Sequence, residues 1–493
     1  MISFLRHARE SGHPGPRARR LPWTPAFAGV TALLLLGACS LGPAYEKLQQ
    51  VAVPAQFDGA TAAADVWPDR EWWRGFNSRE LDELIAQGVE GNRNLRAAVA
   101  RIRQAEAQAK IAGAELYPWL SASGSNSRTK RAPRNPSGTS TSRGGQGFTT
   151  WTGTLTASYQ VDLFGENSAT EDAALTRLES SQYDRQTVAL TLVADIASTY
   201  FQVLAVRERR RLAEETLGNA ASILELLEQR QRAGTVSDLE VAQQRSAVAT
   251  QRAAIPSLLL SERQSLNALA VLLGRPPEQF GIETRTLTDM RLPPVVAGLP
   301  SGLLERRPDL RKAESDLRAA NLDIAVARAQ RFPSISLTAD GGTTSAALSG
   351  LLGPGSFFYT LTASLAAPIF QGGKLQGQEE LTRARFDELI ETYTQAILAA
   401  FQDVENALSS VEQNGEQYKF NRAAYDQARE AYRLADVRFR VGTTDFLNLL
   451  EAQRTVFQAA DAVAQAEAAR YSALVSVYKA LGGGWDGRPL AAK

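Results

Sequence analysis

Two long stretches without proline constrain the fold of this chain more than any other feature of its sequence. They run from Ser168 to Arg232 and from Lys374 to Arg440, and alanine, leucine, glutamine, glutamate and arginine dominate both. These residue types are good helix formers. At about 1.5 Å per residue, a helix of about 65 residues is about 100 Å long, which a globular domain cannot enclose. The sequence therefore predicts helices that pack along neighbours, as a coiled coil or as the staves of a tube.

Each long helix is followed by a glycine turn and a shorter amphipathic helix. The turns read Ala233-Gly234-Thr235 and Val441-Gly442-Thr443, and the return helices are expected from Asp238 to Leu273 and from Asp445 to Leu481. Both pairs are predicted to be antiparallel hairpins with exposed tips. Pro256 predicts a kink in the first return helix, whereas the second has no proline at the matching position.

The chain contains two copies of one arrangement, with a period near 208 residues. Thr154-Leu155-Thr156-Ala157-Ser158 recurs word for word at Thr360-Leu361-Thr362-Ala363-Ser364, and Arg232-Ala233-Gly234-Thr235 matches Arg440-Val441-Gly442-Thr443. Each half is predicted to contain a helix, a strand, a loop, a second strand, the long helix, the glycine turn and the return helix. A period of this length indicates a doubled domain and not a solenoid array.

Four shorter stretches alternate between apolar and hydroxyl-bearing residues. In the second of them, Leu155 and Ala157 point to one face, and Thr154 and Thr156 to the other. A soluble half-buried sheet gives the same alternation. However, strand lengths of about 9–11 residues and aromatic residues near the strand ends favour a membrane barrel.

Four strands are too few to close a barrel, for which about eight is the practical minimum. An open edge in lipid would leave backbone groups unpaired at several kcal/mol each. If the strands span the membrane, the barrel must therefore be shared between chains. Three copies would supply about twelve strands and two copies about eight.

The N-terminus has the layout of a signal peptide, with several arginines before an apolar run from Ala26 to Leu36. The run ends in Leu36-Gly37-Ala38-Cys39, which resembles the bacterial lipobox. That resemblance implies a diacylglyceryl thioether on Cys39, and Ser40 at the next position indicates routing to the outer membrane. An ordinary secretory signal with a chance cysteine is the alternative. We find no stretch of roughly 18 apolar residues that would suggest a transmembrane helix.

The distribution of histidine and cysteine argues against an enzyme. Both histidines, His7 and His13, precede the apolar run, and the single cysteine ends it. Removal of the segment would exclude Ser-His-Asp and Cys-His catalysis and any zinc site built from His or Cys. We therefore expect no catalytic residues, no metal and no cofactor. The net charge of +1 gives no electrostatic footprint for nucleic acid.

Several motifs resemble the TolC superfamily, and specifically the NodT-type lipoprotein outer-membrane factors of tripartite efflux systems. They are Trp72-Trp73, the helix that begins at Asn92, Glu305-Arg306-Arg307-Pro308-Asp309-Leu310, and Phe332-Pro333-Ser334. The resemblance implies an α+β membrane protein that forms a homotrimer. Its twelve-stranded β-barrel would take four strands from each chain and continue into a twelve-helix α-barrel with a mixed equatorial domain. The implied partners are a periplasmic adaptor, an inner-membrane RND-type transporter and outer-membrane lipid, with no nucleic acid.

The patterns and the resemblance together predict the division of the chain. Residues 1–38 form the signal peptide, 39–91 the N-terminal segment and part of the equatorial region, and 281–307 an equatorial linker between the repeats. The first repeat covers 92–280, with strands near 117–126 and 148–162 and a hairpin over 168–273. The second covers 308–484, with strands near 332–341 and 357–367 and a hairpin over 374–481. Residues 485–493 form a C-terminal tail.

The resemblance also implies a gate at the periplasmic end, just around the tip turns. By position, the gate residues are Glu240, Arg438, Phe439, Leu447, Asn448 and Glu451. Neutral Asn448 stands where an aspartate is common in the family, which puts a pore-facing charge in doubt. Simpler roles remain open: Ser237 and Glu240 also form a capping box, and Leu447 also suits a core position.

The tips themselves are the expected docking surface for the adaptor. Their residues are Gly234, Thr235, Val236, Gly442, Thr443 and Thr444. Plain turn residues are the competing interpretation. The predicted function is a passive exit duct for small molecules across the periplasm and outer membrane. Ducts for metal-ion efflux or type I protein secretion, and an envelope coiled-coil scaffold without a channel, are the alternatives.

Overall fold

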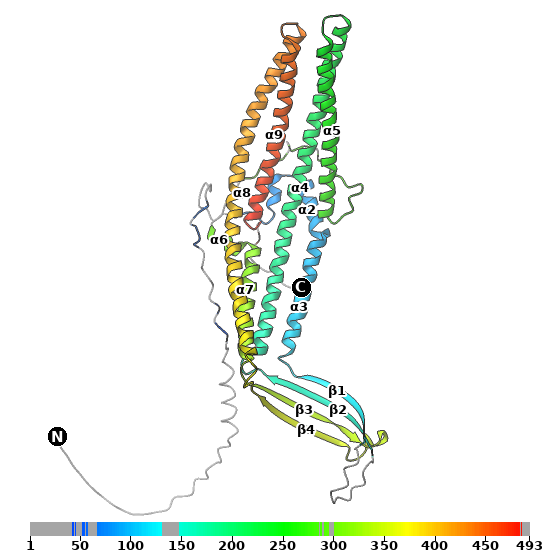
Figure 1. The fold of residues 1–493 in the computed structure, drawn as a ribbon, viewed down its shortest axis with the longest axis vertical. Coiled ribbons are helices and arrows are strands. Elements are labelled where there is room, and N and C mark those ends of the chain that lie inside the picture. The colour runs from blue at the N-terminus through cyan, green and yellow to red at the C-terminus, as the bar shows by residue number, and fades with distance from the viewer. Residues whose placement is uncertain are drawn as a thin grey trace, which may run out of the picture.

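The computed structural model describes residues 42, 43, 45, 52–54, 56, 57, 67–130, 147–284, 286, 287, 290–294, 300–483 and 485. The expected signal peptide, Cys39 and residues 486–493 of the tail lie outside the described residues. The described chain is long and narrow (Figure 1), with a β-sheet at one end, two helical hairpin tips at the other and short helices around the middle. Long helices run side by side between the two ends.

The elements follow one another in a repeated order. They are η2 (Trp72–Phe76), α2 (Arg79–Gly91), α3 (Arg93–Ala114), β1 (Trp119–Thr129), β2 (Phe148–Val161), α4 (Glu166–Arg232), α5 (Asp238–Leu272), α6 (Pro300–Arg306), α7 (Pro308–Ala329), β3 (Ser334–Ser345), η3 (Leu348–Gly350), β4 (Phe357–Ala366), α8 (Lys374–Arg440) and α9 (Phe446–Ala480). Helices α4 and α8 have 67 residues each, and α5 and α9 have 35 each. The tandem duplication read from the sequence is thus confirmed.

Glycines set the limits of both long helices. Gly165 and Gly373 cap their N-termini with φ values of 76° and 85°. Gly234 and Gly442 follow their C-termini with φ values of 73° and 79°. A residue with a Cβ atom is strained in this left-handed region, whereas glycine is not. The next amide in each turn donates to a carbonyl of the last helical turn, so each hairpin reverses through a closed C-cap.

Shorter helices meet end to end beside the long ones. Asn92 caps α3 and donates from Nδ2 to the carbonyl oxygen of Leu272, 2.8 Å away at the end of α5. In the second half, Arg307 before α7 donates from Nη1 to the carbonyl oxygen of Ala480 at the end of α9, over 3.3 Å. Each long helix therefore has an almost continuous partner of two joined helices, and the helical wall runs unbroken from the sheet to the tips. Within α5, Pro256 lacks an amide hydrogen, and the helix continues on both sides of it.

An aromatic core lies at the level of these junctions. Trp72 of η2 stacks on Tyr478 of α9 with ring centroids 4.7 Å apart, and Phe76 packs edge to face on Phe201 of α4 at 4.9 Å. Glu80 of α2 accepts hydrogen bonds from Tyr200 and from the amide of Thr284, both over 3.1 Å. The N-terminal segment and the linker between the repeats thus wrap the middle of the helical wall as a mixed layer.

Helix α4 is more apolar than the lack of a continuous apolar stretch in the sequence suggests. This helix contains an 18-residue window with a mean hydropathy of 1.6, which is long and apolar enough to cross a membrane by length and composition alone. In this chain 56% of that window is buried. It includes Ile196, Tyr200 and Leu204, which form the aromatic and aliphatic core just described. Burial in the protein explains the hydropathy.

The junction of α5 with α3 allows a test of close backbone packing. A Cβ atom at Gly274 would overlap the carbonyl oxygen of Gly91, and Gly274 also has a φ of 71°. Gly234→Ala introduces the same left-handed strain in open space, at a cost of about 1–2 kcal/mol. Gly274→Ala should cost about 1–3 kcal/mol more, because the backbone of the neighbouring helix must shift. Thermal unfolding of the purified protein should show the larger loss for Gly274→Ala, and equal losses would contradict end-to-end packing.

Candidate functional site

The four strands form one antiparallel sheet in the order β1-β2-β3-β4. Its register aligns like residues in rows across all four strands. One row is polar and consists of Ser121, Thr156, Asp340 and Thr360. The neighbouring row is apolar and consists of Leu120, Ala157, Ala339 and Leu361. The alternation seen in each strand therefore continues across the sheet and gives it one hydroxyl-rich face and one apolar face.

The two faces differ in what they contact. On the polar face, Thr156 donates from Oγ1 to Oδ1 of Asp340 over 2.6 Å. On the apolar face, Leu361 and Leu365 are 76% and 70% exposed, and Tyr359 is 73% exposed. A broad exposed apolar surface marks contact with a membrane or a partner. Aromatic residues at the ends of spanning strands match the girdles of membrane barrels.

The sheet has two open edges. Within the described part of the single chain, β1 pairs only with β2, and β4 pairs only with β3. The outer edges of β1 and β4 thus have no backbone partner in this chain. In hydrocarbon, each unpaired group would cost several kcal/mol, so other copies must complete the sheet.

The two hairpin tips are joined by a small hydrophobic core, called here the tip cluster. Its buried members are Ile223 and Leu227 of α4, Val241 of α5, Phe439 of α8, and Phe446 and Leu449 of α9. Phe439 and Phe446 lie edge to face with ring centroids 6.1 Å apart. The tip cluster therefore holds the two hairpins of one chain together near their ends.

Arg230 of α4 ties the two tips further. Its guanidinium carbon lies 4.8 Å from the centre of the Phe439 ring. It also donates to the carbonyl oxygens of Phe439 and Arg440, over 3.3 and 3.0 Å. These carbonyls are at the C-terminal end of α8, where a positive charge is favourable. No local sequence signal predicts this contact, because it joins residues 209 and 210 positions apart.

The predicted gate residues divide into two groups. Phe439 is only 4% exposed and belongs to the tip cluster, and Glu240 accepts hydrogen bonds from the amide and hydroxyl of Ser237. The capping box left open as the simpler role of Glu240 is thus present. The second group is exposed and consists of Arg438, Leu447, Asn448 and Glu451. The chain by itself brings only this second group to its surface.

Asn448 makes local contacts that an aspartate could not make. Its Nδ2 donates to Oδ1 of Asp445 over 2.7 Å and to Oγ1 of Thr444 over 3.1 Å. Asp445 is the N-cap of α9 and also accepts from the amide of Asn448 over 3.4 Å. The side-chain amide therefore stabilises the start of α9 next to the turn.

The tip turns expose most of their predicted docking residues. Gly234, Thr235, Gly442 and Thr443 are exposed, while Val236 and Thr444 are half-buried. The hydroxyls of Thr235 and Thr443 donate back to the carbonyl oxygens of Arg230 and Arg438, over 3.0 and 3.2 Å. Each turn is thus internally bonded and presents a compact surface. Among the described residues, no group of three or more His, Cys, Asp or Glu could hold a metal ion.

The two halves have different residues at equivalent positions of their tips. With the offset of 208, Phe439 and Phe446 correspond to Gln231 and Asp238. In the first half, Gln231 donates a hydrogen bond to Asp238, whereas the second half has the aromatic pair. One hairpin tip is therefore closed by a polar contact and the other by an apolar one.

Comparisons with known proteins agree with this geometry. The family model described as outer membrane efflux protein matches residues 84–275 and 299–483, which correspond to the two halves of the chain. The pyoverdine export outer membrane protein OpmQ of Pseudomonas aeruginosa is 42% identical over 463 residues, or 93% of this chain and 96% of that protein. The toluene efflux pump outer membrane protein TtgC of Pseudomonas putida is 35% identical over 464 residues, or 92% of this chain and 94% of that protein.

A solved structure supports the same assignment. The open state of the Neisseria gonorrhoeae MtrE outer membrane channel is 31% identical and has a TM-score of 0.80. The match covers 90% of this chain and 98% of that chain. The shared fold therefore extends over most of the chain.

Removal of the Phe439 side chain tests whether the tip cluster joins the hairpins. Phe439→Ala should destabilise the tips by about 3–5 kcal/mol. Hydrogen exchange of the α4 amides near Ile223 and Leu227 should become about a hundredfold to a few thousandfold faster, because local opening is then easier. Leu447→Ala, at a position that is 62% exposed, is the matched control and should leave exchange unchanged. Equal exchange rates in the two variants would mean that Phe439 does not hold the tips.

Proposed function

This chain belongs to the outer membrane efflux protein family and is the outer-membrane exit duct of an efflux pump; from this premise, we propose that three copies form one passive channel. In this proposal, the copies pair edge to edge, β4 of one with β1 of the next. Their polar sheet faces line a water-filled pore, and their apolar faces contact lipid. The helices continue the tube into the periplasm.

The sheet is the observation that carries this proposal. It has a hydroxyl-rich face, an exposed apolar face and two open edges, all in strands of 10 to 14 residues. A soluble sheet would bury its apolar face under another layer of the protein. A scaffold made only of coiled coils would not need such a sheet. Three copies are supported because they supply about twelve strands, enough to leave a water-filled interior.

The tips are proposed to dock a periplasmic adaptor, which connects the duct to an inner-membrane RND-type transporter. Exposed turns at the end of a long tube support this role. We find no Gly-x-x-x-x-Gly-Lys-Ser/Thr phosphate loop in the sequence, so energy is assigned to the transporter. OpmQ is named for pyoverdine and TtgC for toluene, and both are similar to this chain along most of its length. We therefore assign cargo choice to the partner pump.

The gate is proposed to consist of the exposed group around the second tip, Arg438, Leu447, Asn448 and Glu451. Phe439 and Glu240 are assigned a supporting role, because one packs in the tip cluster and the other caps α5. Opening would move the hairpins relative to those of the neighbouring copies. Acylation of Cys39 is proposed to hold the N-terminus in the outer membrane.

Two experiments test the function. One measures the conductance of the purified protein in planar lipid bilayers, and the other measures export from cells in which the gene is deleted. The duct should give discrete conductance steps, and deletion should raise intracellular accumulation of exported compounds until the gene is restored. A protein that inserts as single copies without conductance would overturn the proposal. Cys39→Ser should lose the lipid mass but retain conductance, because the strands carry the channel.

A charge substitution tests the proposed gate. Asn448→Asp places a carboxylate beside Asp445 and should raise the cation over anion permeability ratio roughly twofold or more. Glu451→Gln removes a neighbouring exposed carboxylate and should lower the same ratio. The ratio is obtained from reversal potentials in a salt gradient. Unchanged ratios in both variants would exclude these residues from the pore.

A further inference from the structure

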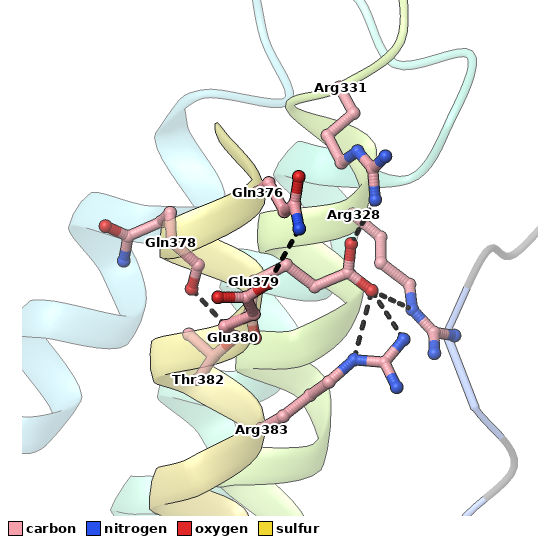
Figure 2. A network of polar contacts seen from close by, with 8 residues as sticks. All are labelled: Arg328, Arg331, Gln376, Gln378, Glu379, Glu380, Thr382 and Arg383. Carbon is pink, nitrogen blue, oxygen red and sulfur yellow. Dashed lines mark hydrogen bonds and ion pairs between the residues drawn. The ribbon is translucent and has the colours of Figure 1, made fainter. Parts of the chain in front are cut away.

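A buried carboxylate surrounded by three arginines lies where the sheet meets the helical wall. Glu379 in the second turn of α8 accepts hydrogen bonds from Arg328 of α7 over 3.0 Å, from Arg331 over 2.6 Å, and from two nitrogens of Arg383 over 3.1 and 2.6 Å. Figure 2 shows the three guanidinium groups gathered around this one side chain, while Glu380 bonds to Gln376 on another side of the helix. We call the four residues the arginine cluster.

The arginine cluster has more positive charge than its carboxylate neutralises. Arg331 and Arg383 alone bring two positive charges to one carboxylate, so at least one positive charge is in excess. Hydrogen bonds from Arg383, and then from Arg331 and Arg328, lower the pKa of Glu379 to about 2 against the opposing effect of burial. The carboxylate is therefore ionised at neutral pH. Its side chain is 8% exposed, whereas those of Arg331 and Arg383 are 50% and 51% exposed. The excess charge thus faces outward.

The first half of the chain has the same carboxylate without the arginines. With the offset of 208, Glu379 and Arg383 correspond to Glu171 and Leu175. The offset between α7 and α3 is 215, because Phe332-Pro333 matches Tyr117-Pro118, so Arg328 and Arg331 correspond to Gly113 and Leu116. The geometry is conserved, since a Cβ atom at Gly113 would lie 2.5 Å from Oε1 of Glu171. The fold therefore needs the carboxylate position but not the three arginines. Because the three arginines are present in just one half, their role needs a separate explanation.

The position of the N-terminal segment indicates that this face is outside the tube. Asn321 of α7 donates from Nδ2 to the carbonyl oxygen of Pro43 over 3.0 Å. Arg328 lies seven residues further along α7, which is about two turns, so it shares the face of Asn321. Pro43 is four residues after Cys39, a reach of at most about 14 Å. Two helical turns span about 11 Å, so Pro43 and the arginine cluster are about that far apart along α7.

The chain around the cluster changes from apolar to charged at this level. Ile369 and Phe370, between β4 and α8, are 93% and 88% exposed in the single chain. Lys374 then begins α8, and Glu379 follows five residues later, about 8 Å along the helix. The cluster therefore lies just beyond the end of the spanning strands. In the orientation of an outer-membrane duct, this is the headgroup layer of the periplasmic leaflet.

We propose that the arginine cluster binds the phosphate of an anionic phospholipid headgroup in the periplasmic leaflet of the outer membrane. This inference rests on the proposed function, because it requires the sheet to span that membrane. Guanidinium groups present paired donors that match phosphate oxygens, and Glu379 holds three of them in one place. The bound lipid would fix the depth of the duct beside its own acyl anchor. The second half of each chain would provide one such site.

The test measures lipid retained by the purified duct. Protein reconstituted with equal amounts of phosphatidylglycerol and phosphatidylethanolamine is extracted gently and analysed by native mass spectrometry. Wild type should retain phosphatidylglycerol in preference to phosphatidylethanolamine. Arg331→Gln with Arg383→Gln should retain about tenfold less phosphatidylglycerol. Arg433→Gln removes a 60% exposed arginine on α8, far from the sheet, and is the matched control that should retain as much as wild type.

Further measurements distinguish a bound lipid from free phosphate, and loss of the lipid site from loss of the channel. Excess inorganic phosphate should not displace the retained lipid, and displacement would identify a free-anion site instead. Each single variant leaves two guanidinium groups on Glu379, so Arg331→Gln alone replaces the double variant if that fails to assemble. Conductance should be unchanged in all variants, since the pore is not touched. Equal retention of both lipids by wild type, or no loss in the arginine variants, would overturn the site while leaving the duct intact.

Discussion

Backbone hydrogen bonding at the edges of the sheet is the constraint on which the rest of this structure depends. A strand in hydrocarbon must have partners on both sides, and the described part of this chain provides them for β2 and β3 only. Assembly is therefore a condition of folding in the membrane and not an addition to it. The helices obey the same geometry: each strand leads into one helix of the wall, so closure of the sheet also closes the tube. The polar row of Ser121, Thr156, Asp340 and Thr360 and the apolar row next to it run in register across all four strands, as the wall of a channel requires.

The two copies of the duplicated domain together form the helical wall, and the differences between them form its specialised parts. Both halves keep the glycine caps, the 67-residue helices and the end-to-end junctions. They differ at the tips and at the junction of the sheet with the helical wall. At the tips, a polar pair in one half replaces the aromatic pair of Phe439 and Phe446 in the other. At the junction of the sheet with the helical wall, the described residues place arginines around the carboxylate of the second half only. The same backbone thus carries different chemistry at equivalent places.

Much of the fold could be predicted from the sequence, because its signals are local. Alternation identifies the strands, and Gly234 and Gly442 mark the hairpin turns through their left-handed conformation. The tip cluster could not be predicted, because periodicity gives the apolar face of a helix but not the helix that covers it. Phe439 is a predicted gate residue by position, and in this chain it packs between helices. The short elements η2 and α2 are likewise not among the predicted helices, and the aromatic residues of η2 pack on α4 and α9, far away in the sequence.

Disulfide trapping between copies tests edge-to-edge closure most directly. The sequence has one cysteine, Cys39, so once that residue is acylated an introduced pair adds the only free thiols. Single cysteines would be scanned along the outer edge of β1 and combined with cysteines along β4, then oxidised in intact outer membranes. The account predicts crosslinked species of two and three chains and none larger, with bonds only between registers that continue the antiparallel pairing. Crosslinks within one chain, or a ladder that extends beyond three, would contradict a closed barrel made of three copies.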